Sequence, residues 1–148
     1  MSGPDTRRFD DVSVGDVLPP LEIPVTTTGI VAAAIATRDY QNVHHDPEAA
    51  RRLGSPDIFM NILTSNALVE RYVGEWAGPE ALLRSVSIRL GVPNYPGMTM
   101  AMNGQVSARA VDGERWVDID VVGRNERGDH LTGTVRIELA GGAAHAGR

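Results

Sequence analysis

The side chains best suited to chemistry gather in one short segment, residues 38–50, which reads RDYQNVHHDPEAA. Within it Asp39 precedes His44 by five residues in a turn-like sequence. A carboxylate and an imidazole on one loop can hold the same water molecule, with one group accepting a proton while the other donates one. We therefore predict general acid–base catalysis by Asp39 and His44. The sequence leaves open which of them is the acid and which the base.

The two residues after His44 suggest other roles. His45 and Asp46 could join His44 in a metal site, but adjacent histidines in an extended segment point apart, and no further cluster of ligands is visible. We therefore predict no metal. Asp46 stands directly before Pro47, which is the usual sequence of an N-cap and the first turn of a short helix, and Gly54 would end that helix.

Composition limits the classes of protein that need consideration. The 148 residues are 42% hydrophobic and 22% charged, as in an ordinary globular protein, and we expect one domain over residues 1–148 with flexible ends at 1–8 and 141–148. The net charge is -5, which argues against nucleic-acid binding, although all 14 basic residues are arginine. No cysteine is present, so disulfides and a thiolate nucleophile are excluded. No apolar run suits a signal peptide or a membrane span, so we expect a cytoplasmic protein without membrane contact.

Two helices are expected to position the Asp–His loop. Residues 30–38 are rich in alanine and form a short helix that leads into the loop, with Thr28 as its cap. The longest helical candidate runs from residue 58 to 76, with Asp57 as its N-cap and Gly78 ending it. Its first twelve residues carry no charge. A helix that is apolar nearly all round is surrounded by other structure, so we predict that this one lies in the core.

The remaining segments have the pattern of β-strands. Residues 21–27 contain Pro24 and predict a short or edge strand. Asp112-Gly113 and residues 125–128 are typical of tight hairpin turns. They separate long extended runs in which apolar and polar residues alternate, so we predict an antiparallel meander with one apolar face. The extended runs are 82–92, 98–111, 115–125 and 130–140. One long helix beside such a sheet indicates an α+β fold in which the sheet curls around the helix.

The order of these elements and the segment Asp39-x4-His44, followed by Asp46 and Ala50, resemble the MaoC-like hydratases of the hot-dog fold, the (R)-specific enoyl-CoA hydratase group. Further runs are similar to the small MaoC-like subunits of bacterial enoyl-CoA hydratases that act on shortened steroid side chains. These runs are RDYQNVHHD, DIFMNILT, RYVGEWAGP, RLGVPNY and VVGRNERGDH. That group pairs the small subunit with a second MaoC-like chain, so the resemblance implies a heterodimer or heterotetramer.

The resemblance also implies an activity. Asp39 and His44 would hold the water that adds across the double bond of a 2-enoyl-CoA, giving a 3-hydroxyacyl-CoA. The acyl group would be a steroid side chain, as in cholesterol catabolism. No cofactor is implied, because coenzyme A is part of the substrate.

Two features of the family pattern are altered in this chain. Where the family reads D-x-N-P-[ILV]-H, Gln41 and Asn42 replace Asn and Pro, and we regard both as possible supporting residues. Where the family has a Gly near the start of the central helix, this chain has Asn61. Water addition builds negative charge on the thioester oxygen, and free N–H groups at a helix start can stabilise it. We expect the backbone of Asn61 or Ile62 to supply this donor.

Other interpretations remain open at this point. The chain could be a non-catalytic MaoC-like subunit that stabilises or shapes the active site of its partner. A hot-dog thioesterase is less favoured, because that reaction does not explain the Asp–His spacing with a donor at the helix start. Some individual polar residues could also act alone. Arg89 could bind a phosphate, whereas we interpret His130 as structural or solvent-facing, and Thr64 and Asn66 as core polar groups.

Overall fold

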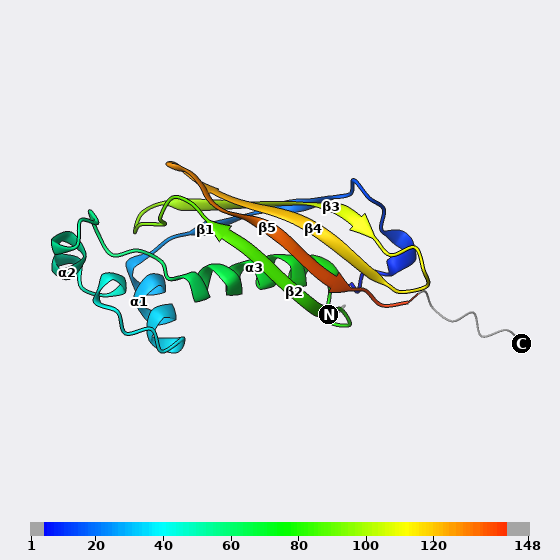
Figure 1. Ribbon diagram of the computed structural model, residues 1–148, viewed down its shortest axis with the longest axis horizontal. Coiled ribbons are helices and arrows are strands. Elements are labelled where there is room, and N and C mark those ends of the chain that lie inside the picture. Colours follow the sequence, from blue (N-terminus) through cyan, green and yellow to red (C-terminus); the bar gives the residue numbers. More distant parts are fainter. Residues whose placement is uncertain (1–4, 142–148) are drawn as a thin grey trace, which may run out of the picture.

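The computed structural model describes residues 5–141 of the chain (Figure 1). The predicted flexibility of residues 1–4 and 142–148 lies outside the described residues. Residues 5–8 were also expected to be flexible, yet two of them make backbone contacts. The N–H of Arg7 donates to the carbonyl of Ala77 over 2.9 Å, and Arg8 forms a β-bridge with Ala140. The start of the described chain is therefore attached to both the sheet and the long helix.

The described structure contains a five-stranded antiparallel sheet with the strand order β1-β3-β4-β5-β2. Two hairpins join β3, β4 and β5 in the predicted meander, whereas β1 and β2 form the two edges. The strands are β1 (Val17–Pro24), β2 (Leu82–Leu90), β3 (Thr99–Arg109), β4 (Trp116–Asn125) and β5 (Gly128–Glu138). The four extended runs predicted after residue 80 therefore correspond to β2–β5, with ends that differ by at most two residues.

Strand β1 contains consecutive prolines but is still a strand. The strand predicted over residues 21–27 is in fact β1, which begins at Val17 and ends at Pro24. Proline cannot donate to a neighbouring strand, so it is confined to edges and bulges. Both conditions hold, because β1 is an edge strand and its pairing with β3 is irregular between Leu18 and Leu21.

One face of the sheet is apolar, as the alternation predicted, and the long helix α3 (Ile62–Ala77) lies along it (Figure 1). In β5 the side chains of Leu131, Val135 and Ile137 are buried on this face. Gly133 occupies the same face at the closest approach of β2, where an added Cβ would lie only 2.1 Å from the carbonyl oxygen of Ser87. The core thus lies between α3 and this face of the sheet. The close approach of β2 to β5 requires glycine at position 133.

Helix α3 begins later than the sequence suggested. The expected start was residue 58 with Asp57 as N-cap, but the N-cap is Asn61, whose side-chain oxygen accepts the N–H of Thr64 over 3.0 Å. The preceding residues are extended, because the N–H of Phe59 donates to the carbonyl of Val43 and that of Met60 to Asn94. A run of uncharged, buried residues is as typical of a buried extended segment as of a buried helix. Residues 58–60 were therefore wrongly assigned to the helix.

The prediction that α3 is surrounded on all sides is also wrong for this chain alone. Val69 and Val73 are fully buried against the sheet, but Ile62 and Leu63 in the first turn are 50% and 47% exposed. Toward the other end, Gly78 has φ +86, and an added Cβ there would lie 2.8 Å from the backbone of Asp5. Gly78 therefore ends the helix and leaves room for the start of the chain.

Two shorter helices lie beyond the beginning of α3 at one end of the molecule (Figure 1). Helix α1 (Thr27–Ala36) is capped by Thr26 rather than the predicted Thr28, since the Thr26 hydroxyl accepts the N–H of Gly29 over 3.0 Å. Helix α2 (Pro47–Arg52) is capped by Asp46, as predicted. Short 3-10 turns cover Phe9–Asp11 and Asn42–His44. Within the described part of the chain, no helix combines the length and the apolar character needed to cross a membrane.

Candidate active site

The end of α1 places Asp39 beside the start of α3. Arg38 adopts φ +57, and it is the one described residue other than glycine with a positive φ. The N–H of Arg38 donates to Ile35 over 3.0 Å and that of Asp39 to Ala34 over 2.9 Å, which is the hydrogen-bond pattern of a Schellman motif. This turn reverses the chain directly after the helix. The carboxylate of Asp39 consequently lies against the side chain of Asn61, with 3.1 Å between Oδ2 and Nδ2.

His44 is buried, with 6% of its surface exposed, and is held by a backbone carbonyl. Its Nδ1 lies 2.7 Å from the carbonyl oxygen of Phe59. Because a carbonyl oxygen can only accept, Nδ1 carries a proton and Nε2 is left to face the loop. Nε2 lies 3.3 Å from Oδ2 of Asp39. The structure therefore brings the predicted pair together on the same side of one loop.

The contact between these two groups requires a proton or a water molecule. In neutral His44, Nε2 is an acceptor, and the ionised Asp39 has only acceptor oxygens. The pair is satisfied when Nε2 is protonated or when a water donates to both. Asp39 favours its ionised form, since the hydrogen bond from Asn61 lowers the pKa of this carboxyl below its ordinary value. The N–H of Gln41 and the nearby His44 also lower it, whereas burial opposes them.

The first turn of α3 presents free backbone donors. The side-chain oxygen of Asn61 accepts the N–H of Thr64, and its carbonyl accepts that of Ser65. Within residues 5–141, by contrast, the N–H groups of Asn61, Ile62 and Leu63 have no hydrogen-bond acceptor. The two residues expected from the sequence to supply an oxyanion donor thus both retain an unused N–H close to the Asp–His pair.

The two possible supporting residues, Gln41 and Asn42, contribute backbone groups and not side chains. Gln41 is exposed and contributes its backbone N–H, which donates to Oδ1 of Asp39 over 3.3 Å. Asn42 begins the 3-10 turn that carries His44, and its carbonyl accepts the N–H groups of His45 and Asp46. His45 is itself exposed. Among the described residues there is no group of three histidine and acidic side chains that could hold a metal ion.

Comparison with known proteins identifies the family. No family model matches the chain. It is, however, 51% identical over 126 residues to the 3-oxo-4,17-pregnadiene-20-carboxyl-CoA hydratase beta subunit of Mycobacterium tuberculosis, a match that covers 85% of this chain and 95% of that protein. This chain belongs to the MaoC-like hydratase family. The resemblance inferred from the sequence is therefore confirmed.

Solved structures agree on the fold of this MaoC-like chain. The ChsH1-ChsH2 complex from Mycobacterium tuberculosis contains a chain that superposes with a TM-score of 0.82 at 50% identity, covering 86% of this chain and 98% of that one. A MaoC-like dehydratase superposes with a TM-score of 0.84 at 22% identity, covering 93% of this chain but 44% of that one. The predicted α+β hot-dog fold is confirmed by these neighbours and by the antiparallel sheet itself.

The elements that carry the Asp–His pair of the MaoC-like chain, and those next to them, also carry exposed apolar side chains. They come from α1, the loop, the C-cap of α2 and the first turn of α3, and all are exposed by about half or more. These residues, which we call the apolar rim, are Ile35, Tyr40, Leu53, Ile62 and Leu63. Exposed apolar groups that gather at one place on a surface mark a site for a ligand or another protein.

Other polar residues of the MaoC-like chain turn out to be structural. His130 is buried, not solvent-facing: its Nδ1–H donates to the carbonyl of Val92 over 2.7 Å, and Nε2 accepts from Ser65 over 2.8 Å. Thr64 belongs to the cap of α3. Asn66 was expected in the core but is half-buried and donates to the carbonyl of Ile62 on its own helix.

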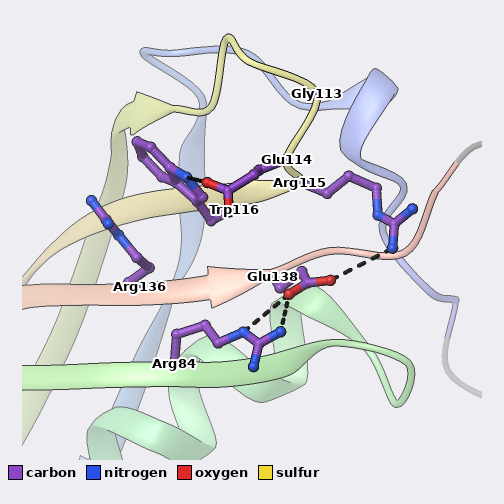
Figure 2. A pocket seen from close by; sticks show the side chains of 7 residues that line it. All are labelled: Arg84, Gly113, Glu114, Arg115, Trp116, Arg136 and Glu138. Carbon is purple, nitrogen blue, oxygen red and sulfur yellow. Dashed lines mark hydrogen bonds and ion pairs between the residues drawn. The ribbon is translucent and has the colours of Figure 1, made fainter.

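A surface pocket of about 460 Å³ lies elsewhere (Figure 2), at the end of the sheet away from α1 and α2 (Figure 1). It is rich in arginine, but each guanidinium has a carboxylate partner. Arg84 and Arg115 both pair with Glu138, and Arg136 lies 2.7 Å from Asp118 while stacking over a tryptophan. Because these charges are already compensated, we interpret the cluster as ion pairs that connect β2, β4 and β5 rather than as an anion site.

Proposed function

We propose that this chain is the catalytic subunit of an enoyl-CoA hydratase that adds water to a 2-enoyl-CoA and yields a 3-hydroxyacyl-CoA. The observation that carries the proposal is the 3.3 Å contact between Nε2 of His44 and Oδ2 of Asp39, which also accepts a hydrogen bond from Asn61, the N-cap of the helix whose first N–H groups are free. These are the three parts that the reaction requires, namely a base, an acid and a donor for the thioester oxygen.

The proposed mechanism gives each group one task. The carboxylate of Asp39 accepts a proton from water while the water oxygen forms a bond to C3 of the enoyl group. The electrons of the double bond move toward the thioester oxygen, where the N–H of Ile62 stabilises the charge. The protonated Nε2 of His44 then delivers a proton to C2. The proton on Asp39 passes to Nε2 across their contact and restores the pair.

The contacts of the two side chains support this assignment of acid and base. Asp39 is held in its ionised form by the amide of Asn61, which suits a group that accepts a proton. The Nδ1–H of His44 is occupied by the carbonyl of Phe59, so Nε2 is the nitrogen that can gain and lose a proton. A subunit that only shaped its partner's site would have no use for this pair, so the catalytic interpretation is favoured over the non-catalytic one.

The substrate and partner are proposed from the relative and from the surface. The 51% identical protein is named for a steroid-derived acyl-CoA, and the apolar rim would suit such an acyl group. The chain of the ChsH1-ChsH2 complex that this chain resembles is part of an assembly with a second chain. We propose a second MaoC-like chain as partner here, in a heterodimer or heterotetramer, and no cofactor beyond the coenzyme A of the substrate.

The direct test is co-purification with candidate MaoC-like partner chains, followed by a hydration assay. The complex should hydrate a steroidal 2-enoyl-CoA faster than a short-chain 2-enoyl-CoA, as followed by loss of the enoyl-thioester absorbance. Equal rates would remove the steroid part of the proposal. No hydration of either substrate by any assembled complex would remove the hydratase.

A further inference from the structure

The side chain of Asn61 uses every hydrogen-bonding group it has. Its Nδ2 donates to Oδ2 of Asp39 over 3.1 Å and to Oγ1 of Thr37 over 2.9 Å. Its Oδ1 accepts both the N–H and the hydroxyl of Thr64. Asn61 is only 2% exposed, so a rotated amide would leave these partners unsatisfied and turn an oxygen toward the carboxylate. The amide therefore has one favourable orientation.

Thr37 also fixes the orientation of the Asn61 amide, because its hydroxyl oxygen accepts a hydrogen bond from Nδ2. It is the C-cap of α1, and its hydroxyl donates to the carbonyl of Ala33 over 2.8 Å. With its proton used in this way, the hydroxyl oxygen faces Asn61 as an acceptor. The end of α1 and the beginning of α3 are thus joined through a threonine and an asparagine, and the carboxylate of Asp39 lies in the same network.

We propose that Asn61, oriented by Thr37, is a positioning residue that directs the Asp39 carboxylate toward His44 while its other end caps the helix that supplies the oxyanion donors. This inference rests on the proposed function, because it assigns a task within the proposed catalytic pair. The amide contacts Oδ2, the same oxygen that faces Nε2 of His44. One side chain thereby sets the relative position of the base and of the N–H groups at the helix start.

The capping task and the positioning task can be separated by substitution. A serine caps a helix about as well as an asparagine, but its side chain is too short to reach Asp39. An aspartate keeps the capping oxygen but places a second carboxylate beside Asp39. If Asn61 served only as a cap, Asn61→Ser would leave the titration of Asp39 unchanged, whereas Asn61→Asp shows the size of the shift that a neighbouring charge causes. The hydrogen bond from Asn61 is also the largest cause that lowers the pKa of Asp39.

The experiment compares Asn61→Ser, Asn61→Asp and Thr37→Val in the full chain assembled with its MaoC-like partner. Thr37→Ser restores the hydroxyl, and Thr132→Val is the matched control, since Thr132 is exposed on β5. The first readout is an NMR titration of the Asp39 carboxyl carbon without substrate. The second is the pH profile of kcat/KM, and thermal unfolding serves as the check on folding.

We expect the Asp39 midpoint to rise by about one pH unit or more in Asn61→Asp, because like charges disfavour ionisation. It should rise less in Asn61→Ser and Thr37→Val, and remain at the wild-type value in Thr37→Ser and Thr132→Val. The acidic limb of kcat/KM should move in the same direction, with kcat changing more than KM. An unchanged midpoint in Asn61→Ser would overturn the proposal, whatever the midpoint in Asn61→Asp. If these variants do not assemble, equal behaviour of Thr37→Val and Thr37→Ser would overturn it.

The two readouts distinguish this inference from the proposed function. The titration needs no turnover, so shifted midpoints in a protein that hydrates no enoyl-CoA would support the positioning role and contradict the hydratase. Unchanged midpoints in an active complex would contradict the positioning role alone.

Discussion

Backbone carbonyls set the protonated ring nitrogen of the two buried histidines, His44 and His130. The carbonyl of Phe59 fixes the tautomer of His44, and that of Val92 does the same for His130. His44 then faces a carboxylate, whereas His130 faces the hydroxyl of Ser65 in the interior. The same side chain can thus exchange protons in one place and serve as a fixed structural link in the other.

His130 should make stability depend on pH. Burial lowers the pKa of His130, while its bond to Val92 opposes this effect. The unfolded chain gains a proton near pH 6.5 and the folded chain does not, so this contribution to stability is complete above about pH 6.5 and is lost as pH falls toward the folded pKa. The slope approaches about 1.4 kcal/mol per pH unit for one proton. Urea unfolding from pH 7.5 to 5.5 measures it.

His130→Gln keeps a hydrogen-bonding side chain but cannot titrate, so the part of the pH dependence due to His130 should disappear. His45→Gln is the control, since His45 is exposed. An unchanged slope in His130→Gln would show that other groups cause the dependence.

Sequence reasoning depended mainly on side-chain types that can transfer protons. Asp39 and His44 were predicted from their identity and spacing, and the structure brings them into contact. The carbonyl of Phe59 was not foreseen, because every residue has a carbonyl and the sequence does not tell where it points. Thr37 was missed because its role depends on where α3 begins.

Among the elements, the turn after α1 is the most constrained. Arg38 occupies the C′ position of the Schellman motif with φ +57, where glycine is usually found. A residue with a Cβ is disfavoured in this conformation, and a β-branched residue more so. The turn nevertheless must form, because it brings Asp39 to Asn61.

Arg38→Gly should therefore stabilise the folded chain by up to about 1 kcal/mol, since the left-handed conformation costs a residue with a Cβ roughly this amount. Arg38→Val should destabilise it, while Arg38→Ala should lie close to wild type. The midpoint of urea unfolding at pH 7 checks the order. A valine variant as stable as the glycine variant would contradict the assigned backbone conformation.

Strands were predicted more reliably than the central helix. Alternation identified β2 to β5 because one face of the sheet is buried and the other is polar. The start of α3 was misplaced because residues 58–60 are apolar in an extended segment. The cap was nevertheless visible, since Asn61 is a favoured N-cap residue just before a helical run.

At the scale of the whole molecule, the described chain leaves two apolar surfaces uncovered. One is the apolar rim, on and beside the elements that carry the Asp–His pair. The other is the edge strand β2, where Leu82 and Leu83 are exposed and one side of the backbone has no neighbouring strand. An unpaired apolar edge favours association with another chain. The exposed residues at both places agree with the proposed partner subunit.

Leu83→Arg should accordingly weaken association with the MaoC-like partner by at least roughly tenfold, because a charge replaces an apolar group at the proposed contact. Val111→Arg is the matched control, since Val111 is 96% exposed in the loop between β3 and β4. Co-purification and analytical ultracentrifugation measure the effect. Loss of the partner in the control alone would place the contact at the loop between β3 and β4 and not at β2.

The most direct measurement of the central claim is hydration by complexes that carry Asp39→Asn or His44→Gln. Each variant removes one proton-transferring group with little change in shape, so kcat should fall by roughly 100- to 10,000-fold while the complex still assembles. His45→Gln should retain wild-type activity. Hydration at the wild-type rate by either variant in an intact complex would contradict the assignment of Asp39 and His44 as the catalytic pair.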